Sequence, residues 1–195
     1  MQGRHIKLVP ADDKYLDFIY TAETDLSEKN LWSDTRNVPA RDTFADEFHD
    51  RLEHYYFAYF IIVSNDCDEP LGFVYAAQYS PWDRHLYVTI YVSKASRRNI
   101  VASEAGLLMI DYLFSYYDLH KIYSIVYDYN TTSLEFQKKA GFIEEGLFRE
   151  HRYYNGKFHD VHLMALYPDI FYQNFDKRLR QIHSGKRTIN SEEPK

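Results

Sequence analysis

The sequence contains one cysteine, Cys67, so it can form neither an internal disulfide nor a cysteine-rich zinc cage. No apolar run approaches the ~18 residues that a membrane-spanning helix requires. The opening residues, MQGRHIKLVP, lack the apolar segment of a secretory signal. These absences predict a cytoplasmic protein that has no membrane partner.

Positive charge is also scarce, because 23 lysines and arginines face 29 aspartates and glutamates, for a formal net charge of −6. This balance argues against general binding to nucleic acid. It would suit a cationic substrate, although a solvated acidic surface is the more ordinary explanation. Aromatic residues are abundant, with 19 tyrosines and 13 phenylalanines. They predict a bulky core and leave open an aromatic-lined cleft.

The length of 195 residues suits one substantial core and is marginal for two. The sequence has no internal repeat and no low-complexity linker, so we predict a single domain over residues 1–183. Residues 184–195 have Ile189 as their only large apolar side chain. We expect this tail to be disordered.

Hydrophobic patterning divides the chain into short strands and amphipathic helices. It predicts strands over residues 4–9, 56–64, 71–79, 85–93, 120–127, 141–154 and 157–166. It predicts helices over residues 11–22, 42–54, 101–117, 131–140 and 168–182, with irregular polar structure over 25–41. The segment 85–127 reads as strand, helix and strand, which predicts a right-handed crossover between two parallel strands. Asn155-Gly156 predicts a tight hairpin between the last two strands.

The helix over residues 131–140 has two candidate N-terminal caps. Asn130 is one, and Thr132 is the other because Thr132 and Glu135 fit the T-x-x-E capping box. Gly141 follows the helix at the place where a left-handed residue is wanted.

The turn over residues 94–99 joins a strand to the central helix and carries Lys94, Arg97 and Arg98. Free N–H groups at the start of a helix and the helix dipole both attract anions, and the cations add to this field. The pattern predicts a site for a phosphate-bearing cofactor.

The element order and four sequence segments resemble the GNAT superfamily of N-acetyltransferases. The similarity is greatest to the branch that contains spermidine N-acetyltransferases and ribosomal-protein N-terminal acetyltransferases. The four segments, within roughly residues 71–167, are YVSKASRRNIVASEAGLLMIDYLF, KIYSIVYDYN, NTTSLEFQKKAGFIEEG and EHRYYNGKFHDVHLMAL. The resemblance implies an α/β (α+β) GNAT fold, with a mixed and mostly antiparallel sheet of about seven strands and helices on both faces. Its central parallel pair of strands would splay apart to admit acetyl-CoA.

The resemblance also implies which residues hold acetyl-CoA as cosubstrate. The pantetheine arm would bind the backbone of Tyr91, Val92 and Ser93, and Asn130 and Ser133 would lie along the pantetheine and the thioester. The pyrophosphate would bind the turn made by Arg97, Arg98, Asn99, Ile100, Val101, Ala102 and Ser103.

Four positions depart from the family pattern. Ile100 stands where the family turn has its central glycine, and a β-branched side chain adds bulk beside the phosphates. Gln137 replaces a tyrosine that is thought to protonate the leaving thiolate in the polyamine enzymes. Tyr87 replaces a glutamate often found beside the cofactor, and Arg152 stands at the acidic position that precedes Asn-Gly in the ribosomal-protein branch.

Acetyl transfer needs a donor for the carbonyl oxygen and a proton for the departing sulfur. We expect the Val92 N–H to be the oxyanion donor. Ser133 is either the acid or only part of the helix cap. Tyr127 or Tyr129 is an alternative acid, although packing is the more ordinary role for each.

A base is needed to neutralise the amine, and Glu150 is our candidate. His151, His85 and Asp83 are alternatives, and surface or structural roles are more ordinary for both histidines. His159 and His162 fall on opposite faces of a strand, so we expect no metal site there.

We therefore predict an acetyltransferase that transfers acetyl directly to a primary amine, such as a protein N-terminus, a polyamine or an amino sugar. A non-catalytic member that binds ligands or regulates is the alternative, and a longer acyl group is a third. The predicted partners are this amine acceptor, no nucleic acid and no membrane, with a homodimer left open.

Overall fold

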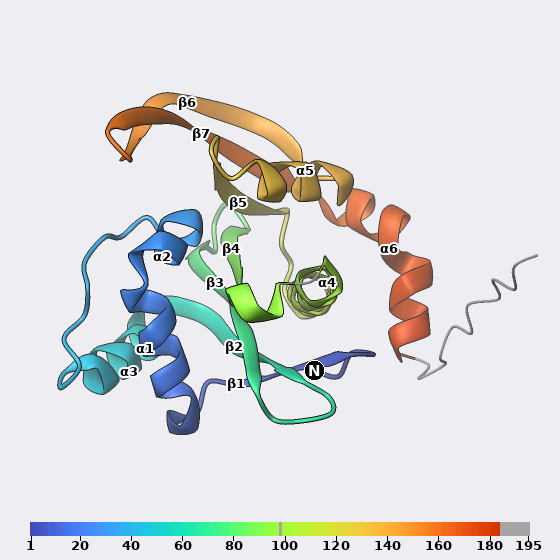
Figure 1. Ribbon diagram of the computed structural model, residues 1–195. Coiled ribbons are helices and arrows are strands. Elements are labelled where there is room, and N and C mark those ends of the chain that lie inside the picture. Colours follow the sequence, from blue (N-terminus) through green and yellow to red (C-terminus); the bar gives the residue numbers. More distant parts are fainter. Residues whose placement is uncertain (98, 184–195) are drawn as a thin grey trace, which may run out of the picture.

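Seven strands form one sheet in the computed structural model, which describes residues 1–97 and 99–183 (Figure 1). The strands are β1 (Ile6–Pro10), β2 (Tyr56–Ser64), β3 (Pro70–Ser80), β4 (His85–Val92), β5 (Lys121–Tyr127), β6 (Ile143–Tyr154) and β7 (Lys157–Leu166). Their order is β1-β2-β3-β4-β5-β7-β6, and only β4 and β5 are parallel neighbours. The predicted fold class is confirmed. The predicted disordered tail, 184–195, lies outside the described residues.

Helices cover both faces of the sheet (Figure 1). They are the 3₁₀ helices η1 (Asp13–Tyr15) and η2 (Lys94–Ser96), and α1 (Leu16–Thr24), α2 (Leu26–Trp32), α3 (Phe44–His54), α4 (Asn99–Tyr116), α5 (Thr131–Lys139) and α6 (Pro168–His183). Helices α1, α2 and α3 lie on one side, and α4, α5 and α6 lie on the other (Figure 1). We call these sides the α1 face and the α4 face.

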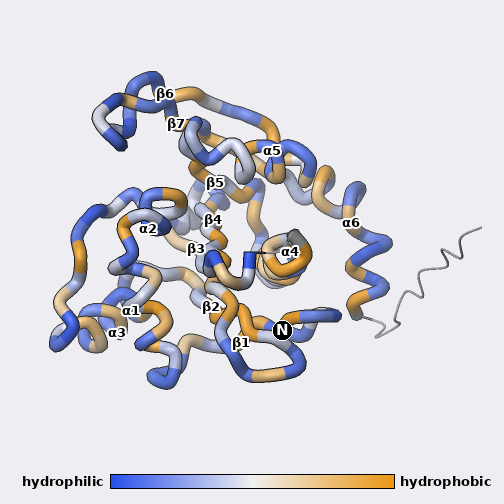
Figure 2. Tube along the Cα trace, in the orientation of Figure 1, coloured by the Kyte–Doolittle hydropathy of each residue, from blue (hydrophilic) through white to orange (hydrophobic). Residues whose placement is uncertain are grey.

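The alternation of side chains along each strand supplies a separate core to each face. On β4, Leu86, Val88 and Val92 join the core of the α4 face, whereas Tyr91 joins the core of the α1 face. Helix α4 is hydrophobic around most of its circumference (Figure 2), because it packs between the sheet and α6. Its burial fixes the turn at its N-terminus against the end of β4.

The helix predictions need two corrections, and the structure decides between the two candidate caps of α5. The segment predicted to be irregular contains α2, which begins because the Asp25 side chain accepts hydrogen bonds from the N–H groups of Ser27 and Glu28. The predicted helix over 11–22 is instead η1 followed by α1, which extends to Thr24. The cap of α5 is Asn130, whose side chain accepts from the Ser133 N–H, so Thr132 lies inside the helix.

Candidate functional site

Strands β4 and β5 pair only over their first residues and then separate. The paired residues are His85–Lys121, Leu86–Ile122 and Tyr87–Tyr123. The Ser93 N–H donates to the Leu71 carbonyl at 2.8 Å, and inter-strand bonds alternate along an antiparallel pair. The peptide groups of Ile90 and Val92 therefore face the gap, beyond the last residue of β4 that pairs with β5. This gap presents backbone donors and acceptors to a ligand.

Gly72 of β3 lies directly beside the end of β4. A Cβ atom at this position would overlap the Tyr91 carbonyl oxygen and would come within 3.0 Å of the Val92 Cα. The absence of a side chain thus lets β3 approach the backbone that carries the predicted oxyanion donor.

The turn between β4 and α4 places Arg97 close to α2. The Arg97 Nη2 forms an ion pair with the Glu28 Oε2, and Glu28 is largely buried. Lys94 is exposed, and Ile100 is 40% exposed in the first turn of α4. Arg98, which we also predicted to bind phosphate, lies outside the described residues.

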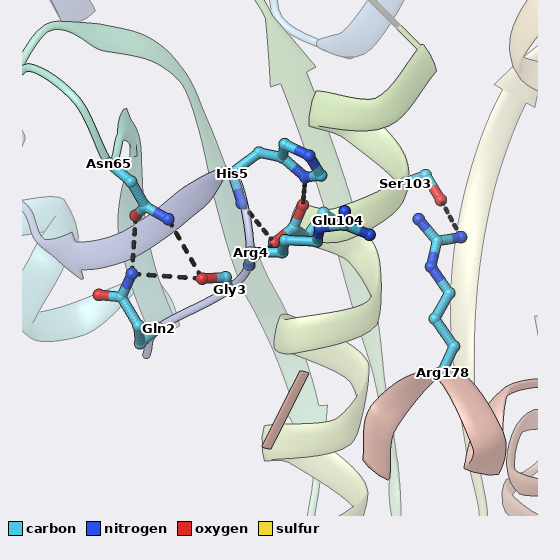
Figure 3. Close-up of polar contacts among 8 residues, drawn as sticks. All are labelled: Gln2, Gly3, Arg4, His5, Asn65, Ser103, Glu104 and Arg178. Carbon is cyan, nitrogen blue, oxygen red and sulfur yellow. Dashed lines mark hydrogen bonds and ion pairs between the residues drawn. The ribbon is translucent and has the colours of Figure 1, made fainter. Parts of the chain in front are cut away.

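The other predicted phosphate-binding residues continue the first turns of α4. Val101 is buried in the core of the α4 face, and Ala102 is partly buried against it. Ser103 accepts a hydrogen bond from the Arg178 Nη1 at 3.0 Å (Figure 3). Helix α6 thereby brings a cation to the start of α4 that the sequence analysis did not assign.

Glu104 ties the chain ahead of β1 to the same helix (Figure 3). Its side chain is buried, and its Oε1 accepts from the Arg4 and His5 N–H groups, the latter at 3.0 Å. Its Oε2 lies 2.9 Å from the His5 Nδ1. Gly3 makes this approach feasible, because a Cβ atom there would overlap the Glu104 carboxylate.

Asn130 and Ser133 meet at the start of α5. The Asn130 Oδ1 accepts from the Ser133 N–H at 3.3 Å, and the Asn130 Nδ2 donates to the Leu31 carbonyl of α2 at 3.1 Å. Gln137 donates to the Ser124 Oγ at 2.8 Å and more weakly to the Ser133 Oγ at 3.5 Å. The Ser133 hydroxyl can therefore accept from Gln137 and still donate its own proton.

Arg152 of β6 holds the end of α2. Its guanidinium donates to the Ser33 carbonyl at 3.0 Å and to the Asp34 carbonyl at 2.7 Å. The Tyr127 hydroxyl donates to the same Ser33 carbonyl, and the Tyr129 hydroxyl donates to a further α2 carbonyl. Burial raises the pKa of Tyr127 to about 12, so its hydroxyl stays protonated. A cation at the C-terminal end of a helix is favourable, which suits Arg152 to this position.

A buried charged group fixes the loop that follows α2. The Lys29 Nζ donates to the Asn37 carbonyl at 2.8 Å and lies 3.9 Å from the Glu23 carboxylate. Arg51 of α3 pairs with Glu23 at 2.9 Å. Burial lowers the pKa of Lys29, although the Glu23 charge opposes that effect. The loop bearing Asp34 is thus fixed from two sides.

A pocket of about 60 Å³ opens on the α1 face at the point where β4 and β5 separate. Residues from β3, β4, β5 and the α2 segment line it. They are Trp32, Asp34, Tyr55, Tyr75, Ala77, Gln78, Tyr87, Val88, Thr89, Ile125 and Tyr127. The lining combines several aromatic residues with one acidic residue, Asp34.

A family model described as "Acetyltransferase (GNAT) domain" matches residues 20–163. The chain belongs to the GNAT acetyltransferase family. This assignment confirms the predicted superfamily and the predicted acyltransferase class.

Two curated GNAT relatives align with this chain. Spermidine N(1)-acetyltransferase of Escherichia coli (strain K12) is 24% identical over 166 residues, which are 83% of this chain and 86% of that protein. The probable N-acetyltransferase YjcK of Bacillus subtilis (strain 168) is 33% identical over 84 residues, which are 43% of this chain and 46% of that protein.

Solved GNAT structures share the fold at lower identity. The spermidine N-acetyltransferase of Vibrio cholerae, in complex with CoA and spermine, superposes with a TM-score of 0.77 and 19% identity over 85% of this chain and 97% of that one. The ribosomal-protein α-N-acetyltransferase RimL, in complex with coenzyme A, gives a TM-score of 0.74 and 15% identity over 87% of this chain and 98% of that one.

The residues at the gap fit the acetyl-CoA that a GNAT enzyme uses. The gap-facing peptide groups of Ile90 and Val92 can bind an amide-containing arm. The N-terminus of α4 faces the adjoining turn, and Arg178 adds a cation there. Ile100 carries a side chain at the position of the family's usual glycine.

The predicted proton-transfer residues are dispersed in this GNAT fold. Glu150 is exposed on β6, at the sheet edge, with a positive φ of 50° and its N–H bonded to Asp160. His151 is exposed on the same strand, and Asp83 accepts from Ser80 in a turn. None of these residues lines the pocket. His85 begins β4, beside the last paired residues of the gap.

His159 has an orientation that the sequence analysis did not anticipate. Its Nδ1 lies 2.6 Å from the Asp128 carboxylate, and its buried Nε2 has no partner among the described residues. His162 instead contacts Glu144 at 2.6 Å. The two histidines thus contact different carboxylates.

Within residues 1–97 and 99–183, no helix is long and apolar enough to cross a membrane.

Proposed function

We propose that this chain transfers the acetyl group of acetyl-CoA to a primary amine bound on the α1 face. One observation carries the proposal: the gap between β4 and β5 and the aromatic pocket meet at the same residues. Tyr87 is the last paired residue of β4, and Tyr87, Val88 and Ile125 all line the pocket. An arm held in the gap would therefore present its end to an amine in the pocket.

Acetyl-CoA supplies a thioester, whose carbonyl carbon bonds to the amine nitrogen while the bond to sulfur breaks. The Ile90 N–H, which faces the gap beside the pocket residue Thr89, is suited to donate to the carbonyl oxygen as negative charge develops there, whereas the Val92 N–H lies further along β4 and is suited to bind the arm. An amine bound as ammonium first loses one proton to solvent or a base and becomes the nucleophile. As the amide forms, the nitrogen loses a second proton, which balances the proton that the Ser133 hydroxyl is suited to give to the departing thiolate. Positioning can account for much of the rate, so Gln137 in place of the tyrosine does not exclude catalysis.

The pocket supports a cationic amine as the acceptor. The Asp34 carboxylate would attract the ammonium form, and the rings of Tyr75, Tyr87 and Tyr127 would add cation–π attraction. The spermidine enzymes and RimL act on different amines, so a polyamine, a protein N-terminus and an amino sugar all stay within the proposal.

Calorimetric titration with acetyl-CoA, followed by a thiol-release assay over an amine panel, tests the proposal. Cys67 is exposed and would react with the thiol reagent, so Cys67→Ser should be used alongside a blank without amine. We expect saturable binding and amine-dependent release of CoA. Absence of binding at millimolar acetyl-CoA would refute the proposal.

Two other proposals have distinct signatures. Binding of acetyl-CoA without thiol release on any amine would indicate a member that binds or regulates. Tighter binding of a longer acyl-CoA than of acetyl-CoA would indicate a larger acyl donor. The cytoplasmic location, the homodimer and the base Glu150 stay predictions from the sequence.

A further inference from the structure

Four apolar side chains form an exposed strip across the outer strands β5, β7 and β6. Ile125 is 45% exposed, Phe148 is 47% exposed and Ile143 is 51% exposed, and Leu163 between them is partly exposed. We call these four residues the apolar strip. Exposed apolar patches of about 300–600 Å² on a single chain are often functional.

Strand pairing places the apolar strip on the α1 face, next to the acceptor pocket. Leu163 of β7 lies opposite Ile125 of β5, and directly opposite residues point to the same face. The β7 residues two positions before and after Leu163 lie opposite Phe148 and Ile143. Because side chains alternate along a strand, all four share one face. Ile125 also lines the pocket, so the apolar strip continues the pocket outward.

The size of the apolar strip favours a small ligand over a protein. Half-exposed side chains of this kind offer about 100 Å² each, so the apolar strip presents on the order of 300 Å² of surface. A specific protein interface buries about 800 Å² on each partner. The apolar strip is thus too small by itself to hold a second copy of this chain, but one acceptor molecule can cover it.

The charges beside the apolar strip favour an uncharged occupant. Glu145 follows Ile143 by two residues, and its carboxylate accepts from the Lys121 Nζ at 2.7 Å and from the Tyr123 hydroxyl at 2.8 Å. A second ammonium group on the acceptor would have to displace Lys121 to reach this carboxylate. Removal of an unpaired charge from water is costly, so a carbon chain suits the apolar strip better than a polyamine does.

We propose that the apolar strip binds the carbon skeleton of the acceptor, so that the preferred acceptors are primary amines on an apolar chain. This inference rests on the proposed function, since it names the substrate class of that same pocket. The amine would occupy the pocket, and its chain would leave the pocket at Ile125 and cross β7 toward Phe148. These two side chains lie two strand spacings apart, about 10 Å, which a chain the length of octylamine spans.

A series of n-alkylamines from ethylamine to octylamine tests the inference with the wild-type protein and acetyl-CoA. These amines have nearly equal pKa values, so differences in kcat/KM report contacts of the chain. We expect kcat/KM to rise about twofold per added methylene, since full burial of a methylene gives about fourfold. Equal values for ethylamine and octylamine would overturn the inference.

Hexylamine and 1,6-diaminohexane form a matched pair that differs in one terminal ammonium group. We expect kcat/KM to be at least fivefold higher for hexylamine, because the second ammonium group of the diamine would lie on the apolar strip. A preference for the diamine would overturn the inference.

Two neighbouring substitutions on β6 separate the two faces of the sheet. Phe148→Ser removes a member of the apolar strip, whereas Leu147→Ser is the control, because Leu147 is 39% exposed and lies opposite His162 on the α4 face. We expect Phe148→Ser to lower kcat/KM about fivefold for octylamine and less than twofold for ethylamine. Leu147→Ser should leave both values within twofold. Equal effects of the two substitutions on octylamine would overturn the inference.

Sedimentation velocity tests the competing occupant, a second copy of this chain. We expect the wild type and Phe148→Ser to sediment alike. Dissociation of a dimer by Phe148→Ser, with unchanged selectivity among the alkylamines, would assign the apolar strip to an interface and overturn the inference. Failure of the proposed function is distinguishable, because the wild type would then acetylate no amine of the series. Failure of this inference alone leaves acetylation of ethylamine intact.

Discussion

The Arg97 guanidinium forms an ion pair with the Glu28 carboxylate of α2. The sequence analysis assigned this same guanidinium to the cofactor phosphates. The Glu28 carboxylate and a cofactor phosphate would therefore compete for the Arg97 guanidinium. Arg97 is about half exposed in this pair and remains within reach of a ligand at the turn. Occupation of the turn by phosphate would therefore loosen the contact between η2 and α2.

Replacing Glu28 with glutamine should strengthen cofactor binding. Removal of the competing charge frees Arg97, and we expect the Kd of CoA to fall about threefold to tenfold in calorimetric titrations at low salt. Glu53→Gln is the matched control, because Glu53 is an exposed glutamate of α3 and its loss changes net charge equally. An unchanged Kd in Glu28→Gln would show that Glu28 does not compete.

Ile100→Gly tests whether the side chain at the usual glycine obstructs the phosphates. The isoleucine is 40% exposed, so its removal sacrifices little packing, and glycine in a first helical turn costs less than about 1 kcal/mol. We expect tighter binding of acetyl-CoA, by severalfold. Ile100→Ala distinguishes the loss of side-chain bulk from the gain of backbone freedom, because alanine removes the bulk without adding the freedom. Unchanged affinity in both variants would mean that the cations already compensate.

Gly72→Ala should distort the end of β4. The added methyl overlaps the Tyr91 carbonyl, and overpacking of this kind typically costs about 1–3 kcal/mol. We expect a lower midpoint in urea unfolding and a loss of acetyl transfer, because Val92 moves with Tyr91. Gly146→Ala is the control, since a Cβ there meets only ordinary contacts of 3.7 Å with Leu163. Equal stability of the two variants would contradict the prediction.

Glu145 should make stability depend on pH in the acidic range. Burial acts against its ionisation, but hydrogen bonds from Lys121, Tyr167 and Tyr123 outweigh burial and lower the pKa of Glu145 to about 2. A lowered folded-state pKa stabilises the protein above the ordinary value of 4.5, and this stabilisation is lost as pH falls toward 2.

The variant Glu145→Gln measures this contribution. We expect its free energy of unfolding to lie about 2 kcal/mol below that of the wild type at pH 7, with the difference shrinking below pH 4. Urea titrations of both proteins at several pH values give the comparison. A deficit of constant size from pH 7 to pH 3 would assign the loss to packing.

The sequence predicted the strands well because turn residues bound them and β-branched or aromatic residues fill them. The predicted ranges 56–64 and 157–166 coincide with β2 and β7. Helix α2 escaped prediction because seven residues with few apolar side chains are unstable alone, and tertiary contacts such as those of Arg152 stabilise it. Asp25 with Glu28 three residues later was the signal that could have revealed its start.

The cofactor side of the site was more predictable than the acceptor side. A strand, a turn and a helix follow one another in sequence, so the turn before α4 could be placed from local patterns, and the family resemblance implied the gap. The pocket brings Trp32 and Asp34 together with Tyr127 of β5, which is far from them in sequence. A local sequence pattern cannot predict such a contact. For the same reason, the partnership of Asp128 with His159 was not foreseen.

The hydrogen bonds that Glu104 accepts from Arg4 and His5 make hydrogen–deuterium exchange at these two amides a measure of the docking of α4. Backbone amides ahead of a first strand usually exchange with solvent quickly, but those of Arg4 and His5 are bonded to a buried side chain of α4. Their deuterium uptake should stay slow while the first turns of α4 remain docked and should rise when those turns open. A ligand that stabilises the first turns of α4 would therefore slow deuterium uptake at the Arg4 and His5 amides, although these residues are far from α4 in sequence.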